Sequence, residues 1–161
     1  MTVYFKTKVA SEWIDYNGHM QDAYYGLIFS YAVDAFQDKV GFDRGYRAKT
    51  GCTIYLIEEH KYYFEELKEG DLVEVKIQVL DAEKKLFQLY CLMLKNGKVV
   101  AASELLEMHV KQLPSPHGVP IPEEIIKKLR LLMLTEGHNE KIKCRARSIS
   151  IARNKTSSST I

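Results

Sequence analysis

Residues 22–40 constrain the fold most strongly, because they form a helical pattern that is apolar around most of the helix. The polar positions recur every four residues in one narrow stripe, made of Asp22, Gly26, Ser30, Asp34 and Asp38. Gly41 then ends the pattern, as glycine commonly ends a helix. A helix with so little polar surface has to be buried, so other elements of the chain must enclose it.

The chain after this helix alternates in the manner of β-strands and predicts such an enclosure. Strands are expected over 52–64, 72–80, 86–94 and 99–110, after a first strand over 3–9. Turns are expected at 69–71, at 81–85 and at Asn96-Gly97, which is a strong two-residue hairpin signal. Prolines then interrupt the chain between 114 and 122, and a second helix is expected from 122 to about 134.

This order of elements predicts an α+β fold of the hotdog type, in which a curved antiparallel sheet of about five strands wraps one long buried helix. Other α+β folds are compatible with the same pattern. An open sheet leaves an edge that needs cover, and pairing two sheets edge to edge supplies it. We therefore expect a homodimer or a homotetramer.

Composition restricts the class of protein. The 161 residues, 46% hydrophobic and 27% charged, suit one globular domain. The net charge of +2 is too small to predict nucleic-acid binding, and no basic face with interleaved aromatics is evident. The sequence shows no signal peptide and no bilayer-spanning run, so we expect a cytoplasmic protein without membrane contact. Three widely spaced cysteines, Cys52, Cys91 and Cys144, argue against a disulfide framework or a zinc site.

The C-terminal end differs in charge from the rest. From His138 onward the chain has six Lys or Arg residues against one acidic residue, Glu140. We expect a single domain over 1–137 and a solvated, basic and serine-rich tail over 138–161. A tail that contacts ligand phosphates or a neighbouring subunit is the alternative.

The stretch WIDYNGHMQDAYY, residues 13–25, carries the candidate chemistry, because the sequence has no nucleophile elbow, P-loop, dinucleotide motif or zinc-protease motif. Asp15 precedes a tight turn at Asn17-Gly18 that leads into the buried helix. Unpaired amides at a helix start stabilise an oxyanion, and a nearby carboxylate can attack a carbonyl or activate water. Alternatively, Asp15 or Asp22 caps the helix and His19 is a packed or surface residue.

This stretch and its helix resemble the signature of hotdog-fold acyl-CoA thioesterases of the 4-hydroxybenzoyl-CoA type, in which an Asp lies three residues before a Gly and precedes the central helix. The resemblance extends over about residues 5–112, through TGCTIYLIEEHKYYFEELKEGD and VVAASELLEMHV. Within that family, the sequence of these stretches closely resembles the betainyl-CoA thioesterases of carnitine degradation. The resemblance implies hydrolysis of a small acyl-CoA without a metal or a cofactor.

The resemblance also implies roles for individual residues. Asp15 would be the nucleophile or the general base, and the backbone amide of Asp22 would polarise the thioester carbonyl. Gly18 would allow close approach of the backbone. The other motif residues would position water, the carboxylate or the loop; they are Asn17, His19 and Gln21, the last standing where many relatives have Asn.

A trimethylammonium acyl group favours aromatic or anionic surroundings. Candidate substrate-binding residues lie around the motif and on the predicted strand 52–64; they are Trp13, Tyr16, Tyr24, Tyr25, Tyr55, Glu58, His60 and Tyr62. Core packing is the alternative role for each, and a pocket for aromatic or short aliphatic acyl groups would use similar residues. Candidate partners of the CoA phosphates are Arg44, Arg47, Lys61 and Lys68.

Two other functions stay open. A hotdog dehydratase acting on hydroxyacyl thioesters would pair a histidine, here His19, with an acid across a dimer. An acyl-CoA sensor or binding subunit would bind the thioester without turnover. The Asp three residues before Gly argues against the dehydratase, and the intact acid at position 15 disfavours the sensor.

Overall fold

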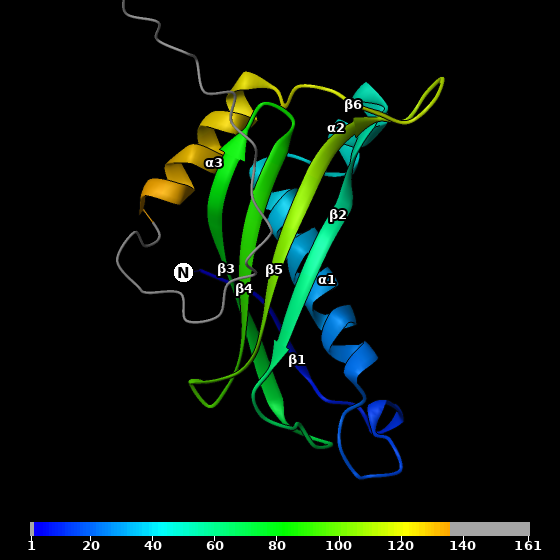
Figure 1. Ribbon diagram of the computed structural model, residues 1–161, viewed down its shortest axis with the longest axis vertical. Helices are drawn as coiled ribbons and strands as arrows, with labels where there is room; N and C mark the ends of the chain where they lie inside the picture. The colour runs from blue at the N-terminus through cyan, green and yellow to red at the C-terminus, as the bar shows by residue number, and fades with distance from the viewer. Residues whose placement is uncertain (1, 136–161) are drawn as a thin grey trace, which may run out of the picture.

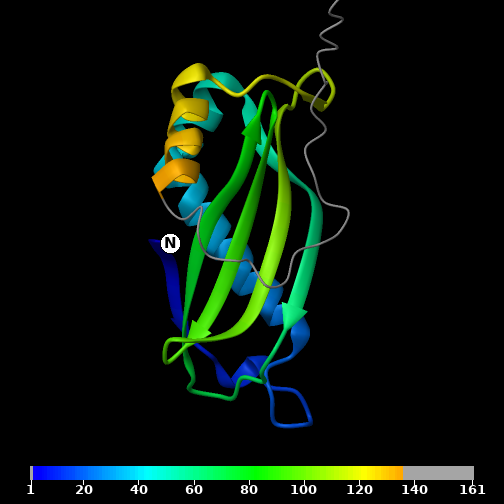
Figure 2. The same ribbon diagram turned by 60° about the vertical axis from the view of Figure 1, so that its left-hand side comes forward.

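The structure is a computed structural model that describes residues 2–135. Within these residues there are three α-helices, α1 (Asp22–Val40), α2 (Arg44–Thr50) and α3 (Glu123–Thr135), with a short 3-10 turn at Ser11–Trp13. The strands are β1 (Thr2–Lys8), β2 (Cys52–Tyr63), β3 (Leu72–Glu83), β4 (Leu86–Lys95), β5 (Lys98–Lys111) and β6 (His117–Gly118). In Figures 1 and 2, α1 runs along one side of a curved sheet.

The sheet has the strand order β1-β3-β4-β5-β2, and β6 pairs with β5. Every pairing is antiparallel. β4 occupies the centre, as its continuous apolar sequence predicts, while β1 and β2 form the two edges. The predicted α+β hotdog fold is confirmed.

Helix α1 has the predicted bounds. It ends at Gly41, whose φ of 116° is left-handed and therefore favours glycine. The side chains of Ile28, Phe29 and Phe36 are almost fully buried against the sheet. Most of the predicted polar stripe is exposed, so α1 keeps one solvent-facing line along an otherwise enclosed surface. Tyr31 is an exception to the apolar pattern, with 45% of its surface exposed.

Two local features differ from what the sequence indicated. Helix α2 was not predicted, although Asp43 caps its start by accepting a 2.8 Å hydrogen bond from the Tyr46 amide, and Gly51 ends it. β3 extends to Glu83 instead of ending near residue 80, because a register shift between Val79 and Asp81 lets the ladder with β4 continue.

The remaining expectations concern the cysteines, the C-terminal tail and membrane-spanning segments. Cys52 and Cys91 are buried free thiols. Cys144, the boundary at 137 and the tail over 138–161 lie outside the described residues. Within residues 2–135, no helix is both long and apolar enough to cross a membrane.

Candidate active site

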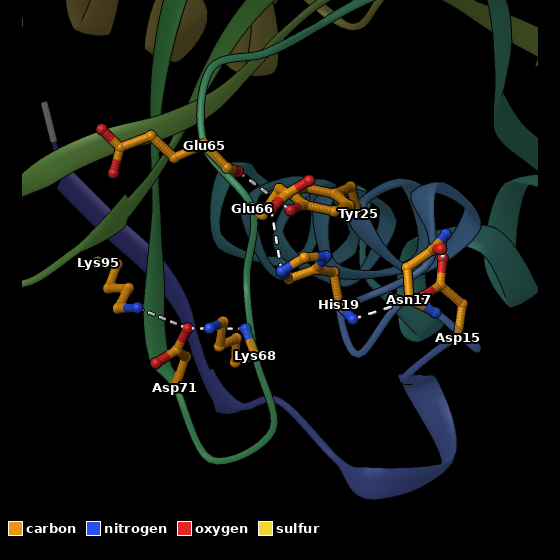
Figure 3. Close-up of polar contacts among 9 residues, drawn as sticks. All are labelled: Asp15, Asn17, His19, Tyr25, Glu65, Glu66, Lys68, Asp71 and Lys95. Carbon is orange, nitrogen blue, oxygen red and sulfur yellow. Dashed lines mark hydrogen bonds and ion pairs between the residues drawn. The ribbon is translucent and has the colours of Figure 1, made fainter.

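Asp15 is held by a tight loop at the start of α1 (Figure 3). Its Oδ1 accepts a hydrogen bond of 2.8 Å from the Asn17 amide and one of 3.4 Å from the His19 amide. The Asn17 side-chain amide donates to Oδ2 at 3.4 Å. Backbone bonds close the loop, because the Asp15 amide donates to the His19 carbonyl and the Gly18 amide to the Asp15 carbonyl. The loop therefore fixes the position of the carboxylate.

Gly18 provides the backbone conformation that this loop needs. Its φ is 80°, whereas Asn17 is not among the described residues with positive φ. A Cβ added at Gly18 would meet no protein atom within 4 Å. Glycine is thus required by the left-handed backbone, and the space beside it is open to a ligand.

Helix α1 begins without a side-chain cap. Gln21 is the N-cap residue and is exposed, and its side chain makes no capping hydrogen bond. The first amides of any α-helix lack partners within the helix. Among residues 2–135, no backbone acceptor is found for the amides of Asp22 and Ala23. These amides, at the positive end of the helix dipole, can bind a developing oxyanion.

Loop 64–71 lies beside the motif loop, residues 15–21, and two contacts join the two loops (Figure 3). Nε2 of His19 lies 3.0 Å from Oε2 of Glu66. The Met20 amide donates a hydrogen bond of 2.7 Å to the Leu67 carbonyl. The His19 side chain therefore ties two loops together instead of facing the Asp15 carboxylate.

Loop 64–71 is itself held at both ends. Oδ2 of Asp71 accepts hydrogen bonds from the Lys68 amide at 2.9 Å and from Nζ of Lys95 at 2.7 Å. Burial tends to raise the pKa of Asp71, but these two partners outweigh it and hold that pKa below its usual value. The Tyr25 hydroxyl donates to the Glu65 carbonyl at 3.2 Å. This loop can therefore position the motif loop.

The aromatic residues predicted around the motif take different places. Trp13 stacks on Tyr24, with ring centroids 5.4 Å apart and planes at 17°. Tyr25 is buried and contacts Tyr63 edge to face at 5.2 Å. Tyr16 is 97% exposed. Trp13 and Tyr24 thus form one aromatic wall close to the helix start, while Tyr25 packs and Tyr16 projects into solvent.

A β-bulge decides which residues of β2 face α1. The register with β5 shifts between Leu56 and Glu58, which leaves Ile57 without a pairing partner. Leu56 before the bulge and Glu59 after it both line a cavity beside α1. Alternate strand residues lie on opposite faces. The predicted candidates from this strand therefore lie on the face away from α1; they are Tyr55, Glu58, His60 and Tyr62.

This cavity lies between α1, α2, β2 and β5 and was not predicted from the sequence. Its volume is about 200 Å³, and three carboxylates and one guanidinium line it. The carboxylates belong to Asp34, Glu59 and Glu107, and the guanidinium belongs to Arg47. A sequence signal did exist, because Glu107 interrupts the apolar strand that was predicted over 99–110.

Glu107 has an unusual environment. Its surface is only 3% exposed. Burial, together with the negative charges of Asp34 and Glu59, raises the pKa of Glu107 to about 7 against the opposing positive charge of Arg47. Among residues 2–135, no side-chain hydrogen bond or ion pair is found for this carboxylate.

The four residues predicted to contact CoA phosphates are spread across the molecule. Lys61 pairs with Glu59 at 2.5 Å, and Arg47 is bound inside the fold by α1 and β2 residues. Arg44 is exposed on α2, at the end of the molecule opposite the motif loop (Figure 1). Lys68 is exposed on loop 64–71, beside the motif loop.

Comparison with known families defines the class of this protein. Residues 9–129 match the thioesterase-like superfamily, and the chain belongs to that superfamily. The family and fold predicted from the sequence are confirmed: this is a hotdog-fold thioesterase, a thioester hydrolase.

Two curated relatives are more specific. The chain is 38% identical over 136 residues to a betainyl-CoA thioesterase of Pseudomonas aeruginosa, a match that covers 83% of this chain and 84% of the relative. It is also 31% identical over 134 residues to an L-carnitine dehydrogenase/betainyl-CoA thioesterase of Rhizobium meliloti. That match covers 82% of this chain but only 26% of the longer relative.

Solved structures of similar proteins also support the thioesterase class. A candidate thioesterase of Pseudomonas putida KT2440 has a TM-score of 0.78 and 30% identity, covering 94% of this chain and 97% of the other. A Staphylococcus aureus protein solved in complex with CoA has a TM-score of 0.77 and 26% identity, covering 94% and 96%.

Proposed function

We propose that this protein hydrolyses betainyl-CoA, or an acyl-CoA with a similarly small cationic acyl group, to the free acid and CoA. The 38% identity to a betainyl-CoA thioesterase supports the substrate class. The observation that carries the reaction is the placement of the Asp15 carboxylate in the loop that leads to the uncapped start of α1.

In the general-base route, the Asp15 carboxylate takes a proton from water as the water oxygen attacks the thioester carbonyl carbon. The carbonyl oxygen becomes an oxyanion and accepts a hydrogen bond from the Asp22 amide. The C–S bond then breaks and CoA leaves as a thiolate, which takes up a proton. In the nucleophilic route, the Asp15 carboxylate itself attacks the carbonyl carbon, the C–S bond breaks and the CoA thiolate leaves with uptake of a proton, and water then hydrolyses the mixed anhydride to the free acid and Asp15.

The other motif residues would support these steps. Asn17 and Gly18 hold the carboxylate in its loop, and His19 fixes that loop against loop 64–71 through Glu66. The exposed Gln21 can reach substrate or water at the helix start. A dehydratase would need the His19 imidazole as a base, and its engagement with Glu66 favours the thioesterase.

We also propose that the protein is a homodimer formed through β2. This strand lies at the edge of the sheet and pairs only with β5 among the described strands. Its Leu56 and Ile57 side chains are 50% and 48% exposed. An unpaired apolar edge favours addition of a second copy. The outer-face candidates would then lie at the interface; they are Tyr55, Glu58, His60 and Tyr62.

Thiol release from a panel of acyl-CoAs tests the proposed reaction. The panel contains betainyl-CoA, a benzoyl-type thioester and short straight-chain thioesters. We expect release with a clear preference for betainyl-CoA. Binding without release from any member would instead support the non-catalytic sensor.

A further inference from the structure

We infer that the cavity between α1, α2, β2 and β5 is a subsite for a quaternary ammonium group, with Glu59, Asp34 and Glu107 as the residues that select its positive charge. The inference deepens the proposed function and relies on it only for the identity of the thioester. The cavity begins at Gly26, one helical turn or about 6 Å along α1 from Asp22.

The charge of the lining favours a cation. Three carboxylates and one guanidinium line the cavity, and the Lys61 ammonium, which pairs with Glu59 at 2.5 Å, lies beside Gly26. The guanidinium of Arg47 is already engaged, because its N–H groups donate to the Phe42 carbonyl at 2.9 Å and to Oε1 of Gln37 at 2.8 Å. It also donates to Oγ1 of Thr53 at 3.4 Å. Arg47 is therefore poorly placed to receive an anionic ligand.

Glu107 supplies a second, independent observation. Its carboxylate lines the cavity, is 3% exposed and has no hydrogen-bond or ion-pair partner among the described residues. Burial of a carboxylate without a partner is unfavourable. A cation within the cavity would relieve that cost, so the unpartnered side chain points to a positively charged ligand.

The rest of the lining favours a methylated organic cation. Within residues 2–135, no cluster of three or more His, Cys, Asp or Glu side chains could hold a metal ion. The apolar side chains of Val33, Ile54 and Leu105 share the cavity with the carboxylates. Methyl groups can contact these side chains, and a quaternary ammonium needs no hydrogen-bond acceptor. The volume of about 200 Å³ suits such a small group.

Titratable and charged groups from four elements surround Glu107, and one of them is the buried Cys91 thiol on β4, whose pKa is raised by burial and by the charges of Glu107 and Glu59. Asp34 lies on α1, Arg47 on α2, and Glu59 on β2, where Lys61 pairs with it. A bound cation favours the ionised form of Glu107 and so lowers its pKa. Binding of the cationic group should therefore strengthen as pH rises through about 7, the pKa of Glu107.

The test compares betainyl-CoA with tert-butylacetyl-CoA, a neutral thioester of the same shape. We expect wild-type kcat/KM to favour betainyl-CoA, and Glu59→Gln and Glu107→Gln each to lower it for betainyl-CoA by about tenfold or more. Turnover of the neutral thioester should stay within about twofold. Glu123→Gln, an exposed residue of α3, serves as the matched control. An unchanged preference in both variants would overturn the inference.

Calorimetric titration with tetramethylammonium chloride, against sodium chloride, separates this inference from the proposed function. We expect saturable binding that is lost in the Glu59→Gln, Glu107→Gln double variant and kept in Glu123→Gln. Such binding without hydrolysis of either thioester would support the cation subsite and refute the proposed reaction. Equal binding by wild type and the double variant, or no binding by wild type, would overturn the subsite. Circular dichroism confirms that each variant is folded.

Discussion

The backbone amide of Asn17 donates a hydrogen bond of 2.8 Å to Oδ1 of Asp15. The carboxylate that the proposed reaction depends on is therefore positioned by the amide two residues along the chain. The side chain of Asn at position 15 could accept the same bond through its own Oδ1. The substitution Asp15→Asn can thus remove the negative charge and keep the hydrogen bond from the Asn17 amide.

Gly18→Ala should lower activity more than stability. The left-handed backbone at Gly18, with φ of 80°, costs an alanine roughly 1–2 kcal/mol. We expect the motif loop to shift and kcat/KM to fall at least about tenfold. The measurement is thiol release combined with thermal unfolding.

Gly97→Ala is the matched control for Gly18→Ala. Gly97 has φ of 78° and, like Gly18, no protein atom within 4 Å of an added Cβ. The two variants should lose similar stability, and only Gly18→Ala should lose activity. Equal activity losses would show that general destabilisation explains the effect.

Breaking the contact between His19 and Glu66 should affect catalysis more than folding. The pair is partly exposed, with 28% and 72% of the side-chain surfaces accessible, so its contribution to stability is about 0–1 kcal/mol. We expect His19→Gln and Glu66→Gln to lower kcat/KM several-fold each. A double-mutant cycle should show that their effects are not additive. Additive effects would mean that the two side chains act separately.

Glu107→Gln should change the pH dependence of stability. The folded-state pKa of Glu107 is about 7, above its ordinary value of 4.5, so the folded state binds the extra proton between these values. Unfolding free energy of the wild type should therefore fall as pH rises from about 4.5 to 7. At pH 8 the variant should be the more stable by roughly 3 kcal/mol at most, and near pH 4 the difference should vanish. Denaturant unfolding across this range measures it, and parallel pH profiles would refute the raised pKa.

Ile57→Glu should disrupt the proposed dimer. The exposed side chain lies at the bulge of the edge strand, where a charge opposes pairing with a second copy. Light scattering coupled to size-exclusion chromatography should report a dimer for wild type and a monomer for the variant. Leu72→Glu, which changes a side chain that is 68% exposed on β3, is the control and should stay dimeric. A monomeric wild type would refute the assignment.

Much of the fold could be predicted from the sequence, because its strongest signals are local. The apolar pattern and Gly41 defined α1, and Asn96-Gly97 defined the hairpin that joins β4 and β5, where both residues have positive φ. Helix α2 was missed because seven residues are too few for a clear periodicity, although its Asp43 cap was readable.

The candidate site was predicted less completely. The loop around Asp15 depends on neighbours in sequence, so the motif indicated it directly. The orientation of β2 depends on one bulge at Ile57, which reverses the faces of all later residues. Glu59, and not the predicted Glu58, therefore faces α1. The cavity with Glu107 requires contacts between distant segments that sequence alone does not place together.

The comparison of Asp15→Asn with wild type tests the central claim most directly. Asp38→Asn, the same change at an exposed position near the end of α1, is the control. With betainyl-CoA as substrate and thiol release as the signal, we predict that Asp15→Asn lowers kcat by about 100-fold or more while its unfolding transition stays close to that of wild type. Turnover near the wild-type rate by a folded Asp15→Asn protein would contradict the assignment of Asp15 as the catalytic carboxylate.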